Sequence, residues 1–232
     1  MCAQRQDNPD SGSVPAAIPE APFDCPLCPR LVRFRDELRL AHPEWFNGPV
    51  PSLGDPAARL LVVGLAPGLK GANRTGRPFT GDFAGDLLYE TLATFGFAAG
   101  TYRADPYDGL ELTGCIVTNA VRCVPPANKP VSSEIAACNR FLQARIASLP
   151  QLCAIVALGR IAHEATLDAL GLKARHYPFA HAAEHRAGPL RLFDSYHCSR
   201  QNTNTGRLTR PMFEAVFAAV ARHLAQPETA AY

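Results

Sequence analysis

The chain has 232 residues, 47% of them apolar, and its formal net charge is +2. This length and apolar content predict one domain of moderate size and exclude a disordered chain. The longest apolar runs, LLVVGLAP and CAIVALG, fall well short of the roughly 18 residues that cross a bilayer. The N-terminus has neither the basic nor the apolar region of a signal peptide, so we expect a cytoplasmic protein without membrane contact.

Strands and helices are predicted to alternate along the chain. The N-terminal residues are rich in Pro, Ala, Ser and Gly, so 1–22 is expected to be a flexible tail, as is 226–232. Apolar runs predict buried strands at 59–65, 115–121, 152–159 and 190–197. Helical patterns follow these runs at 82–95, 132–149, 160–171 and 210–225. This alternation predicts parallel βαβ units in a three-layer α/β/α domain.

Acid-free segments follow three of the predicted strands. Residues 64–81, 119–133 and 197–210 carry eight cations and no carboxylate, which leaves a charge of −6 on the rest of the chain. In a parallel sheet the ligand lies outside the carboxyl ends of the strands, where these segments begin. Charge and topology therefore select the same residues. If the three segments meet in space, they form a cationic face that suits an anionic ligand.

Four cysteines form two candidate ligand pairs. Cys25 and Cys28 stand in a C-x2-C hook, and Cys123 and Cys138 flank a proline-rich segment. Disulfides are rare in a reducing compartment, where clustered thiols more often hold a metal. Zinc and an iron–sulfur cluster both accept four thiolates, and the spacing does not choose between them. The alternative is that these are ordinary buried cysteines.

Several segments resemble motifs of the uracil-DNA glycosylase superfamily. They are GLAPG, NRTGRPFTGD, TNAVRCVPPANKP and HCSRQNTNTGRLT. The resemblance is to the fifth, B-type family, which contains an iron–sulfur cluster, and it covers residues 23–225. The A-type enzymes of the fourth family are similar over the same span, but carry a glutamate where this chain has Leu65. The family's H-P-S motif is His197-Cys198-Ser199 here, and loss of the proline bears on the stiffness of this loop.

The resemblance implies a fold, a cofactor and an activity. The fold is a three-layer α/β/α domain with a four-stranded parallel sheet, and the cofactor is a structural [4Fe–4S] cluster on Cys25, Cys28, Cys123 and Cys138. The activity is that of a monofunctional DNA repair glycosylase, which flips and excises uracil, and also hypoxanthine and xanthine, and leaves an abasic site. The expected partner is double-stranded DNA with a deaminated base, single-stranded DNA is an open alternative, and we expect a monomer.

The chemistry of N-glycosidic hydrolysis gives these motifs their expected roles, because the base must be extracted and its departing anion stabilised. Under the resemblance, Phe79 stacks on the flipped base, and Gly64 and Ala66 line its site. Asn119 reads the amide edge of the base with a donor and an acceptor. His197 donates to the carbonyl oxygen of the departing base. A core aromatic and a strand-end asparagine that satisfies backbone are the structural alternatives.

The activation of water is the least specified step. The segment GLAPG contains no carboxylate, so the nearest candidates are Asp82, as a weak base, and Asn73, which can orient a water molecule. A carboxylate at the start of a helix is often only a cap, and this is the alternative for Asp82. An oxocarbenium-like transition state needs little base, so stabilisation of the leaving group is expected to be the larger effect.

The DNA-facing residues are expected in the cationic segments, where neutral and cationic groups hold phosphates. They are Arg77, Lys129, Ser199, Arg200, Gln201, Asn202 and Arg207.

Three other functions are alternatives to the glycosylase. A phosphate-binding protein is disfavoured because GxxxxGK[ST] and GxGxxG are both absent. A non-catalytic damaged-DNA-binding protein on the same fold is the main alternative, and a strictly uracil-specific A-type-like enzyme is the third.

Overall fold

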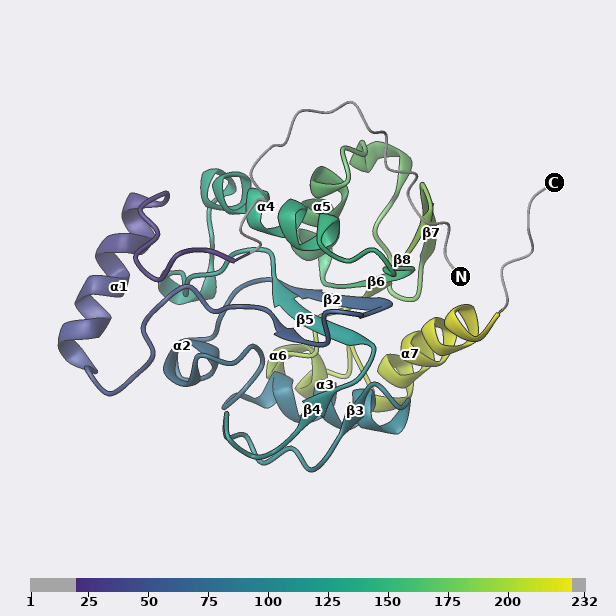
Figure 1. Cartoon of the computed structure of the whole chain (residues 1–232), viewed down its shortest axis with the longest axis horizontal. Coiled ribbons are helices and arrows are strands. Elements are labelled where there is room, and N and C mark those ends of the chain that lie inside the picture. The colour runs from purple at the N-terminus through teal and green to yellow at the C-terminus, as the bar shows by residue number, and fades with distance from the viewer. Residues whose placement is uncertain (1–19, 227–232) are drawn as a thin grey trace.

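A computed structural model describes residues 20–226, and its centre is a six-stranded sheet (Figure 1). The order across this sheet is β1-β5-β2-β6-β8-β7. Its strands are β1 (Leu53–Gly54), β2 (Leu60–Gly64), β5 (Cys115–Asn119), β6 (Ala154–Leu158), β7 (Glu184–Ala187) and β8 (Leu190–Ser195). The inner four strands are parallel, as the sequence predicts, whereas β1 and β7 pair antiparallel at the edges. A separate two-stranded sheet joins β3 (Ala98–Ala99) to β4 (Glu111–Leu112).

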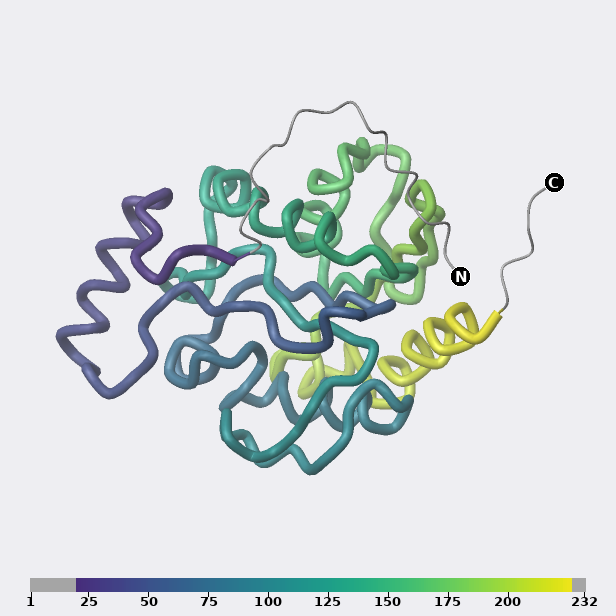
Figure 2. The backbone as a smooth tube through the Cα atoms, in the orientation of Figure 1, coloured from purple at the N-terminus to yellow at the C-terminus, as the bar shows by residue number. Residues whose placement is uncertain are grey.

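Helices cover both faces of the sheet. They are α1 (Pro29–Ala41), α2 (Ala72–Thr75), α3 (Phe83–Thr94), α4 (Ser132–Ala147), α5 (Arg160–Ala169), α6 (Arg200–Asn204) and α7 (Arg210–Ala225), with 3-10 turns η1 (Pro126–Asn128) and η2 (Ala174–His176). Figures 1 and 2 show α3 and α7 on one face of the sheet and α4 and α5 on the other. The three-layer architecture predicted from the sequence is confirmed.

Strand alternation builds a core on each face of the sheet. Leu60 and Val62 of β2 belong to the cluster that contains α3 and α7. Leu61 and Val63 belong to the cluster that contains α4 and α5. Because successive side chains of a strand point to opposite faces, a continuous apolar run is what a strand buried on both sides requires.

The helix ends follow the capping chemistry of the sequence. Asp82 caps α3, because its Oδ1 accepts a hydrogen bond of 3.2 Å from the backbone N–H of Ala84. Gly171 follows α5 with φ of +69°, a conformation that glycine adopts freely. Pro211 lies in the first turn of α7 behind the cap Thr209. None of the helices within residues 20–226 is long and apolar enough to cross a membrane.

The N-terminal part of the described chain differs from the sequence prediction. Helix α1 was not predicted from the sequence. It buries Leu31 and Leu38 against the rest of the domain. The predicted tails lie mostly outside the described residues, but Glu20 pairs with Arg122 and Arg145. The domain therefore includes residues that the prediction assigned to the tail.

The carboxyl ends of the parallel strands lie at one edge of the sheet. In the ladder between β2 and β5, Gly64 is the register partner of Asn119. The ladder between β6 and β8 ends with Leu158 beside Ser195, two residues before His197. Residues far apart in the sequence therefore meet where the chain leaves the sheet, and this edge positions the candidate site.

Candidate active site and cysteine pocket

The candidate site starts from the close approach of two side chains to Gly64. A Cβ atom on this glycine would lie 2.4 Å from both Oδ1 of Asn119 and Cζ of Phe79. Asn119 is 3% exposed, and its Oδ1 has no hydrogen-bond partner among the described residues. A buried acceptor without a partner is uncommon in folded proteins. This acceptor is therefore available to a donor on a ligand.

Phe79 is held in an unusual backbone conformation. Its φ is +51°, which is unfavourable for a bulky residue and is commonly found at functional sites. Its carbonyl oxygen accepts a hydrogen bond of 3.0 Å from the Tyr102 hydroxyl, and a Cβ on Gly85 would lie 1.9 Å from the same oxygen. The hydroxyl of Tyr89 donates to the preceding carbonyl of Pro78 at 2.6 Å. Packing against α3 thus fixes the ring beside Asn119.

His197 lies opposite Phe79. The centroids of the two rings are 6.0 Å apart, and the rings are inclined by 25°. Burial lowers the pKa of His197 to about 4, so the imidazole is neutral at physiological pH. A neutral imidazole still carries one N–H donor, and it adds no net charge to the site.

Cys198, which replaces the family's proline, is fully buried after His197. Its Sγ donates to the backbone oxygen of Ala84 at 3.5 Å, and burial raises its thiol pKa. The side chain of Asn202 donates to the carbonyl of His197 at 2.8 Å. Tertiary contacts to α3 and α6 therefore restrain this loop where a proline would stiffen the backbone.

Asp82, at the start of α3, places a carboxylate beside the loop after β2, which contains none of its own. While Oδ1 caps α3, Oδ2 lies on the side of the loop, 2.8 Å from the Cβ position of Gly68 and 2.4 Å from that of Gly71. Burial raises the pKa of Asp82 above its ordinary value, and the charge of Asp86 adds to this effect. A capping role and a position at the loop are therefore compatible.

Asn73 is committed to the scaffold. It is 1% exposed, and its Nδ2 donates to Oδ1 of Asn47 at 2.9 Å. Its backbone N–H donates to the carbonyl of Gly68 at 3.1 Å. These contacts tie the loop after β2 to the segment that follows α1. They favour Asp82 over Asn73 for a role toward water.

A cleft of about 320 Å³ opens beside His197. The guanidinium of Arg207 lies 4.5 Å above the ring of Tyr196, and that of Arg160 lies 5.4 Å from the ring of Phe179. Asn202 also lines the cleft. Sequence reasoning predicted Asn202 and Arg207 here but missed the other three side chains. Phe179 lies in an irregular loop, and no local pattern places it beside the end of β8.

The other predicted DNA contacts are distributed unevenly. Ser199 caps α6, and the guanidinium of Arg200 lies 5.5 Å from the ring of Phe83. Gln201 and Lys129 are exposed. Ser199, Arg200 and Gln201 lie at the start of α6, and Lys129 follows η1.

Arg77 requires a correction. It is 6% exposed, and its Nη1 lies 2.8 Å from Oδ1 of Asp108. Its guanidinium also lies 5.1 Å from the ring centroid of Tyr89 and 5.6 Å from that of Tyr102. The prediction that Arg77 contacts DNA is wrong, because this buried ion pair holds the turn that carries Phe79. Ala66, predicted at the base site, packs instead toward the cysteine pocket.

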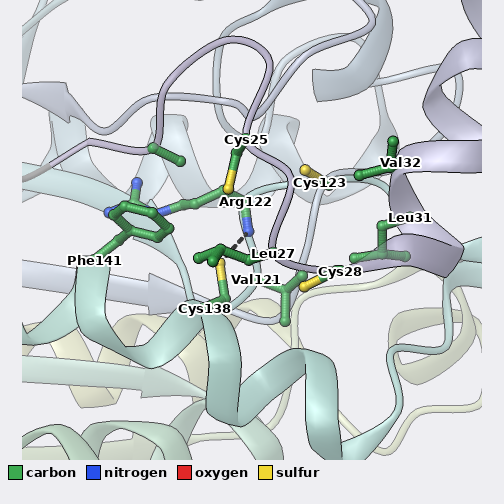
Figure 3. A pocket seen from close by; sticks show the side chains of 11 residues that line it. Cys25, Leu27, Cys28, Leu31, Val32, Val121, Arg122, Cys123, Cys138 and Phe141 are labelled. Carbon is green, nitrogen blue, oxygen red and sulfur yellow. Dashed lines mark hydrogen bonds between the residues drawn. The ribbon is translucent and has the colours of Figure 1, made fainter.

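Cys25, Cys28, Cys123 and Cys138 line one pocket, as the sequence pairing predicts. Figure 3 shows their sulfurs facing a shared space between the N-terminal hook, the loop after β5 and α4. Apolar side chains supply most of the remaining wall. Burial raises the pKa of Cys123 to about 12 and that of Cys138 to about 11, and neighbouring thiols add to the effect. Four converging thiols in an apolar wall fit a group that binds thiolates.

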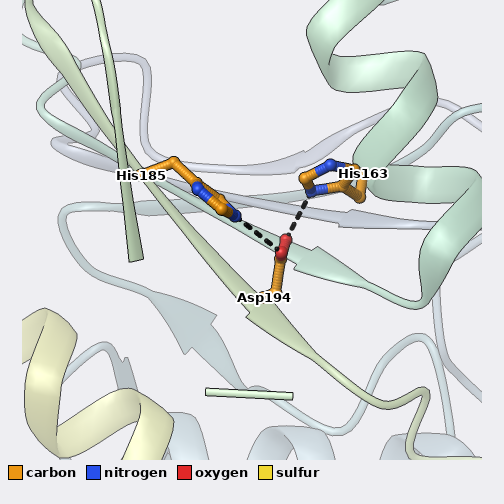
Figure 4. A group of neighbouring side chains, drawn as sticks. All are labelled: His163, His185 and Asp194. Atoms are coloured by element: carbon orange, nitrogen blue, oxygen red, sulfur yellow. Dashed lines mark hydrogen bonds and ion pairs between the residues drawn. The ribbon is translucent and has the colours of Figure 1, made fainter. Parts of the chain in front are cut away.

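A second polar group lies beneath the cleft. Asp194 of β8 accepts from Nδ1 of His163 at 2.7 Å and from Nε2 of His185 at 3.2 Å (Figure 4). Nε2 of His163 lies 2.8 Å from the carbonyl of Tyr177. Burial alone would lower the pKa of His163, but Asp194 raises it above the ordinary value. Because both partners of His163 are acceptors, its imidazolium fixes the start of the loop that carries Phe179.

Comparisons with known proteins show the family of this chain. A family model described as the uracil DNA glycosylase superfamily matches residues 51–221. A type-5 uracil-DNA glycosylase from Thermus thermophilus is 49% identical over 196 residues, which cover 82% of this chain and 89% of that protein. One from Mycobacterium leprae is 40% identical over 89% of this chain and 94% of that protein. A type-4 uracil-DNA glycosylase from Pyrobaculum aerophilum is 35% identical over 54% of this chain and 56% of that protein.

The chain therefore belongs to the uracil-DNA glycosylase superfamily and, within it, to the type-5 family. The resemblance drawn from the sequence motifs is confirmed.

Gly64→Ala tests the geometry of the base site. The added methyl group would collide with Asn119 and Phe79, and misplacement of such groups by about 1 Å can reduce turnover by ~10²-fold. We expect uracil excision to fall by at least about this factor. Gly188→Ala is the control, because a Cβ there meets nothing within 4 Å although φ is +64°. Equal loss of activity in both variants would contradict this geometry.

Proposed function

We propose that this chain excises uracil from DNA by hydrolysing the N-glycosidic bond, and leaves an abasic site. The observation that carries this proposal is the buried, unpartnered Oδ1 of Asn119, beside the ring of Phe79 and on the same edge of the sheet as His197. The imide N–H of uracil would satisfy this oxygen, and its flat ring suits the face of Phe79. A base reaches such a site only after it is flipped out of the duplex.

His197 stabilises the departing base. Its neutral imidazole donates an N–H to the carbonyl oxygen on which negative charge develops. Since the pKa is about 4, the donor is present throughout the physiological range without a change of protonation. The contact from Asn202 to the His197 carbonyl and the buried Cys198 keep this donor in place.

Asp82 positions the attacking water. Its Oδ2 faces the loop after β2, while Oδ1 is held by the start of α3. The type-4 resemblance places a carboxylate within that loop, at the position of Leu65. In this chain Asp82 would reach the same region from α3. A weak base is sufficient if the glycosidic bond is largely broken before attack.

The base range extends to hypoxanthine and xanthine in this proposal. The described wall of the base site contains one amide, one imidazole and one aromatic ring, and the segment GLAPG after β2 contributes no carboxylate that would restrict it to uracil. Equal-time digests of uracil and hypoxanthine duplexes test this range. Release of uracil alone would contradict it.

The DNA strand passes along the cleft beside His197. Arg160 and Arg207 supply positive charge there, and Phe179 and Tyr196 supply aromatic faces. Ser199, Arg200 and Gln201 at the start of α6 and the exposed Lys129 after η1 are proposed as further DNA contacts. A duplex is the expected substrate, a single strand is a second candidate, and one chain is sufficient for the site. Binding should weaken as salt rises, because phosphates are neutralised.

The four cysteines hold a [4Fe–4S] cluster in this proposal. The converging thiols support a thiolate-bound group, and the family resemblance favours iron over zinc. When bound, such a group ties the N-terminal hook to the loop after β5 and to α4. Val121 and Cys123 lie within four residues of Asn119 on that loop, so the cysteines would fix the backbone that carries the base-reading amide.

The enzymatic proposal is tested with a labelled duplex that contains one G·U pair. We expect alkali-labile cleavage at the uracil after incubation with the protein. In His197→Ala, loss of one donor to the developing anion should slow excision by ~10²–10³-fold. Tight binding without any cleavage by the wild type would instead identify a damaged-DNA-binding protein on this fold.

The role of Asp82 predicts a particular pH profile. Its folded pKa is raised, so the active carboxylate is lost as pH falls through that value. His197 contributes no change between pH 6 and 8, because its pKa is about 4. Asp82→Asn should reduce excision at neutral pH by ~10²-fold and remove the part of the acid limb that Asp82 causes. Asp86→Asn should keep the activity and move that limb to lower pH, because the charge of Asp86 raises the pKa of Asp82. Wild-type rates of excision by Asp82→Asn at neutral pH would rule out this assignment.

The cysteine assignment predicts iron and sulfide in the purified protein. Cys138→Ala removes a buried ligand thiol and should abolish most of both, with loss of the visible cluster absorption. Cys115→Ala is the control, since Cys115 is a buried strand residue outside the pocket. Stoichiometric zinc without sulfide in the wild type would contradict the cluster and show that the four cysteines hold zinc.

A further inference from the structure

Two buried arginines adjoin the cysteine pocket. Arg35 of α1 is 4% exposed, and Arg122 after β5 is 1% exposed. Arg122 lines the pocket, as Figure 3 shows. Nη1 of Arg35 donates to the backbone carbonyl of Cys25 at 3.1 Å. A guanidinium keeps its charge inside proteins, and a buried charge is unfavourable unless it is compensated.

The nearby carboxylates do not compensate both charges. Glu20 lies 3.0 Å from Nη1 of Arg122, but the same carboxylate also pairs with Arg145. The acidic neighbour of Arg35 is Asp36, which is 3.9 Å away and has a side chain that is 58% exposed. Exposed pairs of this kind contribute little. Among the described residues, positive charge is therefore left over beside the cysteines.

Unpartnered N–H groups give an independent sign of the same deficit. Nε of Arg35 has no hydrogen-bond partner in the described part of the chain, and neither do Nε and Nη2 of Arg122. Buried donors are nearly always paired in folded proteins. Donors that are both charged and unpaired indicate that anionic acceptors belong in this region.

We propose that Arg35 and Arg122 are the counter-ions of the cysteine-bound cluster. This inference rests on the proposed cluster. Four thiolates around a [4Fe–4S] core carry a net charge of roughly −2 in the oxidised state, which two guanidiniums balance. The backbone N–H of Arg122 also donates to Sγ of Cys138 at 3.3 Å. Because net charge and hydrogen bonds to sulfur set the reduction potential of such clusters, these two residues raise it.

The charge of each arginine can be removed while its length is largely kept. Arg35→Met and Arg122→Met remove the charge, and Arg35→Lys and Arg122→Lys preserve it. Arg39→Met is the matched control, because Arg39 lies one turn further along α1 and pairs at the surface with Asp24 at 2.7 Å. Iron and sulfide content and the reduction potential are measured on each full-length protein without DNA.

The methionine variants should have lower reduction potentials, because a lost positive charge disfavours the added electron. We expect at least a tenfold shift in the one-electron equilibrium for each, which corresponds to about 59 mV. The lysine variants and Arg39→Met should remain near the wild type. If Arg122→Met fails to fold, the result for Arg35→Met decides, because the side chain of Arg35 makes its only hydrogen bond within residues 20–226 to the Cys25 carbonyl.

Two contrary results are distinguishable. Wild-type iron content and potential in the methionine variants would overturn the counter-ion proposal alone. Absence of iron from the wild type would overturn both this proposal and the proposed cluster. Uracil excision by that iron-free protein would leave the glycosylase proposal intact.

Discussion

The parallel pairing of Gly64 with Asn119 is the contact on which the candidate site depends. Because β2 ends in a residue without a side chain, the amide of Asn119 and the ring of Phe79 both reach the end of the sheet. The remaining parts of the site are arranged around that point. His197 arrives from the end of β8, two strands away, and Asp82 arrives from the start of α3. Each comes from a different element, so the sheet register sets their relative positions.

Two kinds of contact stabilise this arrangement from outside. On one side, the buried Arg77–Asp108 pair and the two tyrosine hydroxyls hold the turn at Phe79. On the other side, the cysteine pocket lies on the loop that continues from Asn119. Neither contact belongs to the base site itself. The segments NRTGRPFTGD and TNAVRCVPPANKP therefore each contain a residue of the candidate site and a residue that holds it in place.

The sequence was sufficient to predict the inner four strands and their covering helices, because continuous apolar runs and capping residues are local signals. It also paired the four cysteines correctly in one pocket. It did not predict α1, whose buried face includes an arginine, or the antiparallel edge strands β1 and β7, which are short and partly exposed.

The charge of a motif residue predicted its role less well than its place at the end of a strand predicted its location. Arg77 and Arg122 were counted on the cationic face, yet both are buried, and only the partners brought by the fold reveal this. Asp82 could be recognised as a cap from the sequence, but its second oxygen faces a loop more than ten residues upstream. His163 and Asp194 are 31 residues apart, and no periodicity signals their contact.

The positive φ of Phe79 has a thermodynamic consequence for recognition. A bulky residue in that region is unfavourable by roughly 1–3 kcal/mol, and the surrounding structure must supply the compensation. Here folding of the segment that contains Tyr102 and Asp108 supplies it, so the ring is already immobile before a base arrives. The entropy of ordering that ring is lost once, during folding, and not again at each encounter. In the proposed site, affinity for an extrahelical base is thereby coupled to the local stability of a segment that need not touch DNA at all.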